Sequence, residues 1–372
     1  MKNQVCSGCG AFLQSKDPAA PGFVPAEKRN EGGKGIVCRR CYRLRHYGRF
    51  DGAGPGGESQ AVLRTVTGET EITLLVADFF DLEGSLAPDW PSLVKNSIAL
   101  VVNKSDLIPP RTSRPEVEEW VRTLWQRRFP HRALETVKTV SAVRGGVFNR
   151  LYPLLAGKKV ALAGAANVGK SSLLRQLLTA AGEKNATAPA PTVSPYPGTT
   201  QGLTGWVLKK SGTELFDTPG VTPGTRMGDL LCPTCAARLS PVRKPAVKLW
   251  ELTPGAAVLF GNLAGCWNLS LSTRTIIFFA GDKLPLHRTG EKKGQELMAQ
   301  APDWLRVDCP SCSGKRGRLV EQVFDIRPGQ ELFISGLGWL GPRKQPAVVR
   351  LLAPEKVQTG LRPALTGGKQ KI

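Results

Sequence analysis

Short apolar runs and amphipathic segments alternate through the middle of the chain, from about residue 60 to 225. Residues 115–128 place Val117, Val121 and Trp125 on one side of a predicted helix, together with Trp120 and Leu124. Apolar runs that indicate buried strands occur at 72–77, 98–102, 136–140, 160–163 and 214–216. This alternation predicts an α/β fold with a mainly parallel sheet. Beyond residue 226, short apolar runs stand between glycines and prolines, which predicts a β-rich domain.

The length of 372 residues suggests about two or three domains, and 41% of the residues are apolar. We predict a module at 1–50, an α/β domain at 60–225 and a β-rich domain at 226–372, with 51–60 (DGAGPGGESQ) as a linker. No apolar run reaches the ~18 residues of a membrane span, and no signal-peptide pattern opens the chain. We therefore expect a cytoplasmic location and no membrane partner.

Basic residues greatly outnumber acidic ones. Lys and Arg total 51 against 30 Asp and Glu, for a net charge of +21. A protein this basic usually meets a polyanion, and we favour nucleic acid. A membrane surface is one alternative, but no basic helix shows a clear apolar face. A solvated basic surface without a partner is the other.

A phosphate-binding loop follows the apolar run at 160–163. Residues 164–171 read G-x-x-x-x-G-K-S, and a predicted helix begins directly after them. The glycines let backbone N–H groups surround phosphates, while Lys170 would reach the β- and γ-phosphates and Ser171 would bind Mg²⁺. From this stretch we assign seven nucleotide-binding residues: Gly164, Asn167, Val168, Gly169, Lys170, Ser171 and Ser172.

Guanine recognition is predicted where two strands end. Asn103-Lys104-Ser105-Asp106 fits N-K-x-D, and the Asp106 carboxylate can accept both the N1–H and the exocyclic amine of guanine. Adenine presents the reverse pattern, so this carboxylate selects GTP over ATP. The backbone of Ser141 and Ala142 would contact the guanine O6.

The switch motif comes next. Asp217-Thr218-Pro219-Gly220 fits D-x-x-G, in which Asp217 would hold the Mg²⁺ region and the Gly220 amide would sense the γ-phosphate. Between the phosphate loop and this motif, residues 195–200 (PYPGTT) offer Thr200 to complete the Mg²⁺ shell. The base-recognition motifs precede the phosphate loop, so the order is that of a circularly permuted GTPase.

Eight of the nine cysteines form four C-x-x-C pairs, which in a chain without a secretory signal indicates metal ligation. Cys6, Cys9, Cys38 and Cys41 can form one structural zinc site. Cys232, Cys235, Cys309 and Cys312 are a candidate second zinc site. Redox-active pairs are the alternative reading of both sets. The lone Cys266 is expected to be a small buried apolar residue.

Two basic stretches are candidate RNA contacts. The first surrounds the second cysteine pair and holds Arg39, Arg40, Tyr42, Arg43, Arg45, His46, Tyr47 and Arg49. Arginine suits phosphates and tyrosine suits unstacked bases. The second is a predicted basic tail past residue 340, with Arg343, Lys344, Arg350, Lys356, Arg362, Lys369 and Lys371. A merely solvated surface is the alternative in both places.

The permuted order resembles the YqeH-type circularly permuted GTPases, which carry an N-terminal zinc finger. The motifs that carry the resemblance are CSGCG, VCRRCYRLRHY, ADFFDLEGS, NKSD, NVGKSS, PGTT, DTPG and LHRT. It covers most of residues 1–290; the second cysteine set departs from it. The resemblance implies a GTPase that uses GTP/GDP and Mg²⁺ in small ribosomal subunit assembly, with rRNA rather than DNA as partner. A GTP-regulated RNA-binding factor acting off the ribosome is the alternative.

The resemblance also bears on catalysis. Val221 stands where other GTPases place a water-orienting glutamine, so slow hydrolysis is expected. Relatives with this substitution often use K⁺ held by an asparagine of the phosphate loop, a position that Asn167 occupies; a purely structural Asn167 is the alternative. We assign catalysis to Lys170, Asn167, Thr200 and Gly220.

Overall fold

The computed structural model describes residue 6 and residues 12–18, 22–30, 36–39, 56–110, 112–182, 204–208 and 211–365. These fall into two compact units, each built from separate stretches of chain. The first comprises 1–78, 88–104 and 131–222, and the second comprises 79–87, 105–130 and 223–372. The predicted domain boundaries remain a prediction, because the units follow packing rather than chain order.

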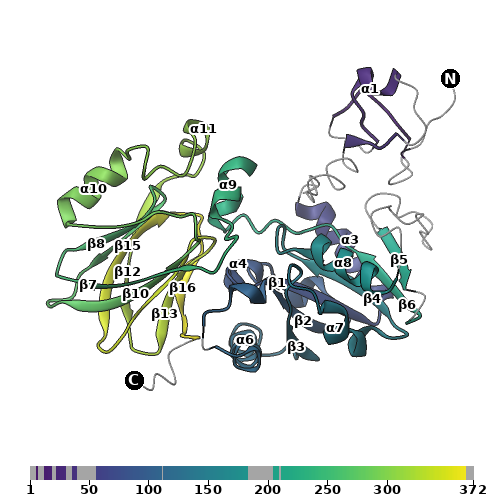
Figure 1. The fold of residues 1–372 in the computed structure, drawn as a ribbon, viewed down its shortest axis with the longest axis horizontal. Coiled ribbons are helices and arrows are strands. Elements are labelled where there is room, and N and C mark those ends of the chain that lie inside the picture. Colours follow the sequence, from purple (N-terminus) through teal and green to yellow (C-terminus); the bar gives the residue numbers. More distant parts are fainter. Residues whose placement is uncertain are drawn as a thin grey trace. The chain divides into compact units, whose positions relative to one another are not determined.

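The first unit is built on a six-stranded sheet in the order β3-β2-β1-β4-β6-β5 (Figure 1). All neighbours are parallel except the β5–β6 pair at the edge. The mainly parallel sheet predicted from the sequence is therefore confirmed. Its strands are β1 (Ile72–Asp78), β2 (Ser97–Asn103), β3 (Thr136–Thr139), β4 (Lys159–Gly164), β5 (Thr204–Leu208) and β6 (Thr213–Asp217).

Helices cover both faces of this sheet because alternate strand residues point to opposite sides. Leu162 packs in one core cluster with Leu151 and Leu173, whereas its neighbour Ala161 packs in another with Val66. The helices of this unit are α1 (Ala26–Asn30), α3 (Gly56–Glu69), α5 (Trp90–Leu93), α7 (Val147–Leu155) and α8 (Lys170–Ala180). The predicted linker at 51–60 is wrong in its second half, because α3 already begins at Gly56; residues 51–55 lie outside the described part.

The second unit contains two five-stranded sheets, in the orders β16-β13-β14-β10-β7 and β11-β8-β9-β15-β12. All the strand pairs within them are antiparallel. One apolar core joins side chains of both sheets, among them Phe260, Phe278 and Leu351, so the predicted β-rich fold is confirmed. The strands are β7 (Ala246–Leu252), β8 (Ala257–Phe260), β9 (Ala264–Asn268), β10 (Arg274–Ala280), β11 (Leu286–Thr289), β12 (Leu319–Ile326), β13 (Gln330–Ile334), β14 (Gly338–Pro342), β15 (Ala347–Pro354) and β16 (Thr359–Pro363).

One long helix, α6, and several short helices complete the described part of the second unit. They are α4 (Leu82–Ser85), α6 (Arg114–Arg128), α9 (Pro233–Leu239), α10 (Glu291–Ala299) and α11 (Pro310–Ser313), with 3₁₀ turns η1 (Ser105–Leu107) and η2 (Met227–Leu230). The predicted helix at 115–128 is confirmed as α6. Ser113 and Glu116 form a capping box at its start, and Val117, Val121 and Trp125 are buried.

The stretch past residue 340 is not a tail as far as residue 365. Residues 347–354 and 359–363 are the strands β15 and β16, whose backbone groups pair with β9, β12 and β13. Arg362, counted in the predicted tail, is only 6% exposed. Lys369 and Lys371 lie outside the described residues. Cys266 is fully buried, as expected.

No helix among the described residues has both the length and the apolar character needed to cross a membrane.

Candidate nucleotide-binding site and cysteine clusters

The predicted nucleotide motifs meet at one edge of the first unit's sheet. Parallel register aligns Asp78 of β1 with Asn103 of β2, and Val76 with Gly164 of β4. Asp217 of β6 lies opposite Leu162, two residues before the phosphate loop begins. Ligands of open parallel sheets bind outside the carboxyl ends of the strands. The sequence therefore brings its motifs to the edge where a nucleotide is expected.

The phosphate loop lies very close to the neighbouring strand. Gly164 has φ = 152°, and a Cβ there would lie 2.4 Å from the Val76 carbonyl oxygen, so only glycine fits. Asn167 adopts φ = 65°, a left-handed conformation that is uncommon outside glycine. Such turns point successive N–H groups inward and create an anion-binding hollow. Ser171 and Ser172 follow in the first turn of α8.

Lys170 is held against this loop. Its side chain is buried, and Nζ donates hydrogen bonds to the carbonyl oxygens of Gly164 (3.0 Å) and Ala165 (3.2 Å). The ammonium group of Lys170 is thus hydrogen-bonded to loop carbonyl oxygens. A bound phosphate would take their place as the hydrogen-bond partner of this ammonium group. The loop and its lysine fit a phosphate ligand in charge and in shape.

Asn103 joins two of the predicted motifs. It is 2% exposed, its Nδ2 donates to the Val168 carbonyl (3.0 Å), and its Oδ1 accepts from the Ala142 N–H (3.1 Å). One buried amide therefore fixes both the phosphate loop and the Ser141–Ala142 loop. The Ser141 hydroxyl in turn accepts from the N–H groups of the two residues that follow Ala142.

Two residues of this site were not predicted from the sequence. Asp78 forms an ion pair with Lys104, whose backbone is also left-handed (φ = 63°). Gln176 of α8 donates to the Ala142 carbonyl (3.1 Å). The signal for Asp78 is its place as a carboxylate ending a buried strand, next to the strand that carries N-K-x-D.

The switch motif contacts the phosphate loop through its backbone. The Ala166 N–H donates to the Val221 carbonyl (2.8 Å), and the Val221 N–H donates to Gly164 (3.3 Å). A Cβ on Gly220 would lie 2.9 Å from Lys170 Nζ. The switch glycine is therefore beside the lysine, as its predicted role at the γ-phosphate requires.

Asp106 is described as part of the second unit, and Thr200 is not described. Asp106 lies in the 3₁₀ turn η1 and belongs to the second unit, three residues after Asn103. Thr200 and the rest of 195–200 lie outside the described residues. Of the predicted magnesium ligands, Ser171 and Asp217 are therefore the described ones.

The second cysteine set forms a tight cluster. The four Sγ atoms of Cys232, Cys235, Cys309 and Cys312 lie within 4.8 Å of one another. Cys232 and Cys309 each cap a short helix, α9 or α11, that begins with proline. Sulfurs around a tetrahedral zinc are ~3.8 Å apart, as Zn–S bonds of ~2.3 Å require. Four thiols at this spacing fit a closed structural metal site.

The thiols of Cys232 and Cys235 differ in acidity. The Cys235 backbone N–H and the nearby thiols lower the pKa of Cys232 to about 7, whereas burial raises the pKa of Cys235 to about 12. The Cys232 N–H also donates to the Cys312 sulfur (3.0 Å), and the Cys309 N–H to the Cys235 sulfur (3.3 Å). Such N–H···S bonds stabilise thiolates, the form that binds a metal.

The first cysteine set is described in part. Cys6 and Cys38 are buried in a small core with Leu13 and Val24, and the Cys38 N–H donates to the Cys6 sulfur (3.1 Å). Cys9 and Cys41 lie outside the described residues, as do the predicted RNA-contact residues that follow Arg39. The described pair is brought together in the way a shared metal requires.

We predict that Asn103→Ala weakens GDP binding by about tenfold or more, because it leaves a buried carbonyl and a partly buried N–H without their Asn103 partner. Fluorescent-GDP titration measures the affinity. Gln176→Leu, which removes only one bond to the same Ala142 loop, is the matched control and should lose much less. An equal loss of GDP affinity in both variants would contradict the proposal that Asn103 holds the phosphate loop and the Ser141–Ala142 loop together.

Three comparisons place this site among known proteins. Residues 159–237 match the family model described as "50S ribosome-binding GTPase". YqeH of Bacillus subtilis is 27% identical and covers 98% of this chain and 100% of its own. NO-associated protein 1, chloroplastic/mitochondrial, of Arabidopsis thaliana is 27% identical over 90% of this chain and 69% of its own. YjeQ of Thermotoga maritima aligns over 41% of this chain and 48% of its own, with 23% identity and a TM-score of 0.28.

The phosphate loop, the switch beside it and the base motifs ahead of both describe a GTPase of permuted order, which implies GTP/GDP and Mg²⁺ as ligands. The similarity to YqeH runs through nearly the whole of both chains. The matched GTPase model and the similarity to YqeH are consistent with a circularly permuted GTPase of the YqeH type.

Proposed function

We propose that this protein is a GTP-driven switch in small ribosomal subunit assembly, which binds rRNA in one nucleotide state and leaves after hydrolysis. The observation that carries the proposal is the backbone contact between the switch and the phosphate loop, because it lets the γ-phosphate act on the chain that enters the second unit. The net charge of +21 supports a polyanionic partner. The proposed compartment is the cytoplasm.

The residues of the site take defined roles in this proposal. Lys170 exchanges its loop carbonyls for the β- and γ-phosphates, and the Gly220 amide senses the γ-phosphate. Asp106 reads the guanine edge. Mg²⁺, held by Ser171, Thr200 and Asp217, would neutralise the phosphate charge that develops during hydrolysis.

Slow, K⁺-stimulated hydrolysis is the finer part of the proposal. Val221 is 4% exposed and pairs with the loop backbone, so it has no group that could orient a water. Asn167 is exposed and stands on the left-handed turn of the phosphate loop. A K⁺ ion held by Asn167 would supply positive charge where other GTPases use an arginine.

Both cysteine sets are proposed to bind structural zinc. In the second set, four clustered thiols bridge two loops 77 residues apart in sequence, counted from Cys232 to Cys309. Closing such a loop with a metal restricts the unfolded chain, so zinc contributes folding free energy. The arginine-rich stretch after Cys38 is the proposed RNA contact of the first set.

Replacing K⁺ by Na⁺ should slow GTP turnover by about tenfold or more, because one charge at the phosphates is lost. Asn167→Ala should remove the difference between the two salts while GDP affinity stays near that of the wild type. Phosphate release is measured at constant ionic strength. Equal rates in K⁺ and Na⁺ would show that Asn167 has only a structural role.

The intact chain should carry two zinc ions, measured by metal analysis after gel filtration. Cys235→Ser should lose one of them, and Cys266→Ala, which removes the lone buried thiol, should lose none. Zinc retention should fall as the pH falls, because protons compete for the thiolates. Absence of zinc, with activity sensitive to thiol alkylation, would favour the redox alternative.

Co-sedimentation with purified ribosomal subunits tests the assembly role. We expect binding to the small subunit with a non-hydrolysable GTP analogue and weaker binding with GDP. Lys170→Ala, which should not bind nucleotide, is the control. Binding to the large subunit alone would contradict the proposed subunit. Binding to free RNA without either subunit would favour the factor acting off the ribosome.

A further inference from the structure

Two helices of the second unit, α4 and α6, are formed by segments that directly follow strands of the first unit's sheet. α4 lies only four residues beyond Asp78, the last residue of β1. α6 belongs to the segment 105–130, which begins inside the N-K-x-D motif that follows β2. The second unit therefore contains the chain directly connected to the predicted base-reading residue, Asp106.

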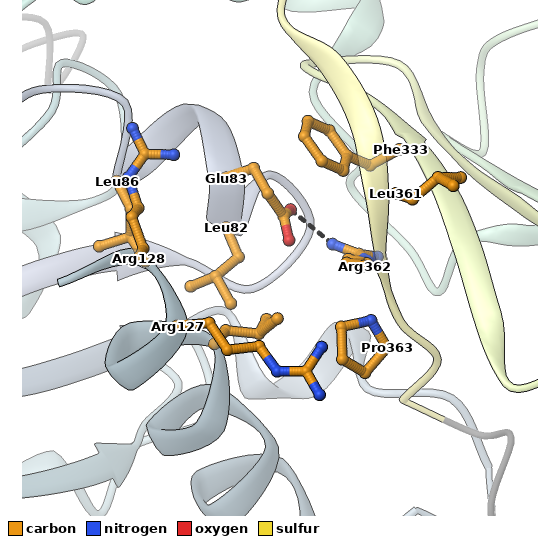
Figure 2. Close-up of a pocket in the computed structure, with 10 residues that line it drawn as sticks. Leu82, Glu83, Leu86, Arg127, Arg128, Phe333, Leu361, Arg362 and Pro363 are labelled. Atoms are coloured by element: carbon orange, nitrogen blue, oxygen red, sulfur yellow. Dashed lines mark hydrogen bonds and ion pairs between the residues drawn. The ribbon is translucent and has the colours of Figure 1, made fainter. Parts of the chain in front are cut away.

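Arg362 of β16 holds these helices to the second unit's sheet (Figure 2). Its guanidinium pairs with Glu83 of α4 (2.5 Å) and with Glu331 of β13 (3.1 Å). The Arg362 and Glu331 side chains are 5% and 4% exposed, and that of Glu83 is 13% exposed. One buried cation thus bridges two carboxylates from distant parts of the chain.

The same guanidinium also lies between two tryptophan rings. It stands 5.0 Å from the ring centre of Trp120 in α6 and 5.1 Å from that of Trp339 in β14. The Trp120 indole N–H donates to the carbonyl of Pro363, the next residue of β16 (2.9 Å). Arg362 therefore contacts α4 and α6 at once, by charge and by cation–π attraction.

A buried ionic cluster of this kind adds little net stability, because desolvation offsets most of its attraction. Burial raises the pKa of the Glu331 carboxyl even beside Arg362. The cluster is satisfied only when β13, β16, α4 and α6 take this one arrangement. The position of α6 in the second unit is thereby restricted.

Asp106, in the 3₁₀ turn η1, is separated from the start of α6 at Arg114 by only a few residues of chain. Leu107 and Ile108 are buried, and Pro109 and Pro110 follow them, which limits the backbone conformations available. The capping box then fixes the start of α6 at Ser113. A displacement of α6 would therefore move the 3₁₀ turn that carries Asp106.

We propose that Arg362 is a positioning residue for guanine recognition, which acts through Trp120 and α6 to hold the Asp106 carboxylate in place. The inference rests on the proposed base-reading role of Asp106. The C-terminal strand of the protein thereby sets how well the site distinguishes guanine from related bases.

A pocket beside the cluster supplies a matched control. It measures about 210 Å³ and is lined by Leu82, Leu124, Phe333 and Arg362. Arg127 lines the same pocket from α6 but is exposed, and Figure 2 shows it apart from the Glu83–Arg362 pair. Arg127→Met removes a positive charge from the same helix and pocket without touching the cluster.

The test compares GDP with inosine diphosphate, which lacks the exocyclic amine that Asp106 would bind. Wild-type protein should prefer GDP by about 10- to 100-fold, the range of one hydrogen bond to a charged group. Trp120→Phe and Glu83→Gln should each lower that preference about threefold or more, and Arg362→Met should lower it further. Arg127→Met should leave it unchanged.

The ratio of the two affinities separates positioning from general destabilisation. A merely structural role would weaken both nucleotides equally and keep the ratio, which would overturn the proposal. Trp120→Phe and Glu83→Gln are mild enough to test it if Arg362→Met does not fold. If Asp106→Asn leaves the wild-type preference unchanged, the base-reading role itself fails. If Asp106→Asn abolishes the preference but the cluster variants keep it, only the positioning role fails.

Discussion

The nucleotide site depends on one buried side chain, the Asn103 amide. Parallel strands bring several loops to one edge but leave each loop free to adopt its own conformation. Asn103 removes that freedom. Its side-chain Nδ2 donates a hydrogen bond to the phosphate loop, and its Oδ1 accepts one from the Ser141–Ala142 loop. Both partners are backbone groups next to a buried side chain, so neither bond is easily replaced by water. The first residue of N-K-x-D thus acts on the protein, whereas the role proposed for the last residue, Asp106, is to act on the base.

The permuted chain order changes what lies downstream of the switch. In this chain β6 is the last strand of the nucleotide sheet, and Gly220 and Val221 follow it. Val221 pairs with the phosphate loop, and from Pro223 onward the chain belongs to the second unit. The proposed movement at the γ-phosphate would therefore pass along the backbone into the β-rich unit, with no intervening element of the nucleotide domain.

Much of the fold and of the candidate nucleotide site could be predicted from local sequence. Three features are each encoded by residues close together in sequence. The strands appear as apolar runs, the phosphate loop has glycines where the backbone makes close contacts, and helix α6 begins with a capping box. Clustering of the second cysteine set was also predictable, since two Cys-Pro-x-Cys turns have few structural roles. The position of Asp217 opposite Leu162 followed from the parallel sheet.

What could not be predicted depends on contacts between distant parts of the chain. Arg362 was counted with a basic tail because the stretch past residue 340 contains many Lys and Arg residues and few acidic ones. Only the fold shows that Glu83 and Glu331, 279 and 31 residues away, surround it. The helix α3 was missed for a related reason: its first residues are glycines, and its packing on β4 outweighs their weak helix propensity.

The turn at Ser335 and Gly336 extends this reasoning to the switch. Its Ser335 carbonyl accepts from the Met227 N–H (3.0 Å), seven residues beyond Gly220. The Ser335 hydroxyl and Gly336 N–H both donate to Asp81 (2.8 and 3.0 Å), three residues beyond β1. One turn therefore binds the chain leaving the switch and the chain leaving β1, while Arg362 binds α4 and α6.

These contacts are made by strands and turns of one sheet. The segment that follows the predicted base-reading residue and the segment that follows the switch are therefore both attached to this sheet. A change at either side would act on the same set of strands, and a shared element of this kind is what the proposed coupling between guanine binding and hydrolysis requires.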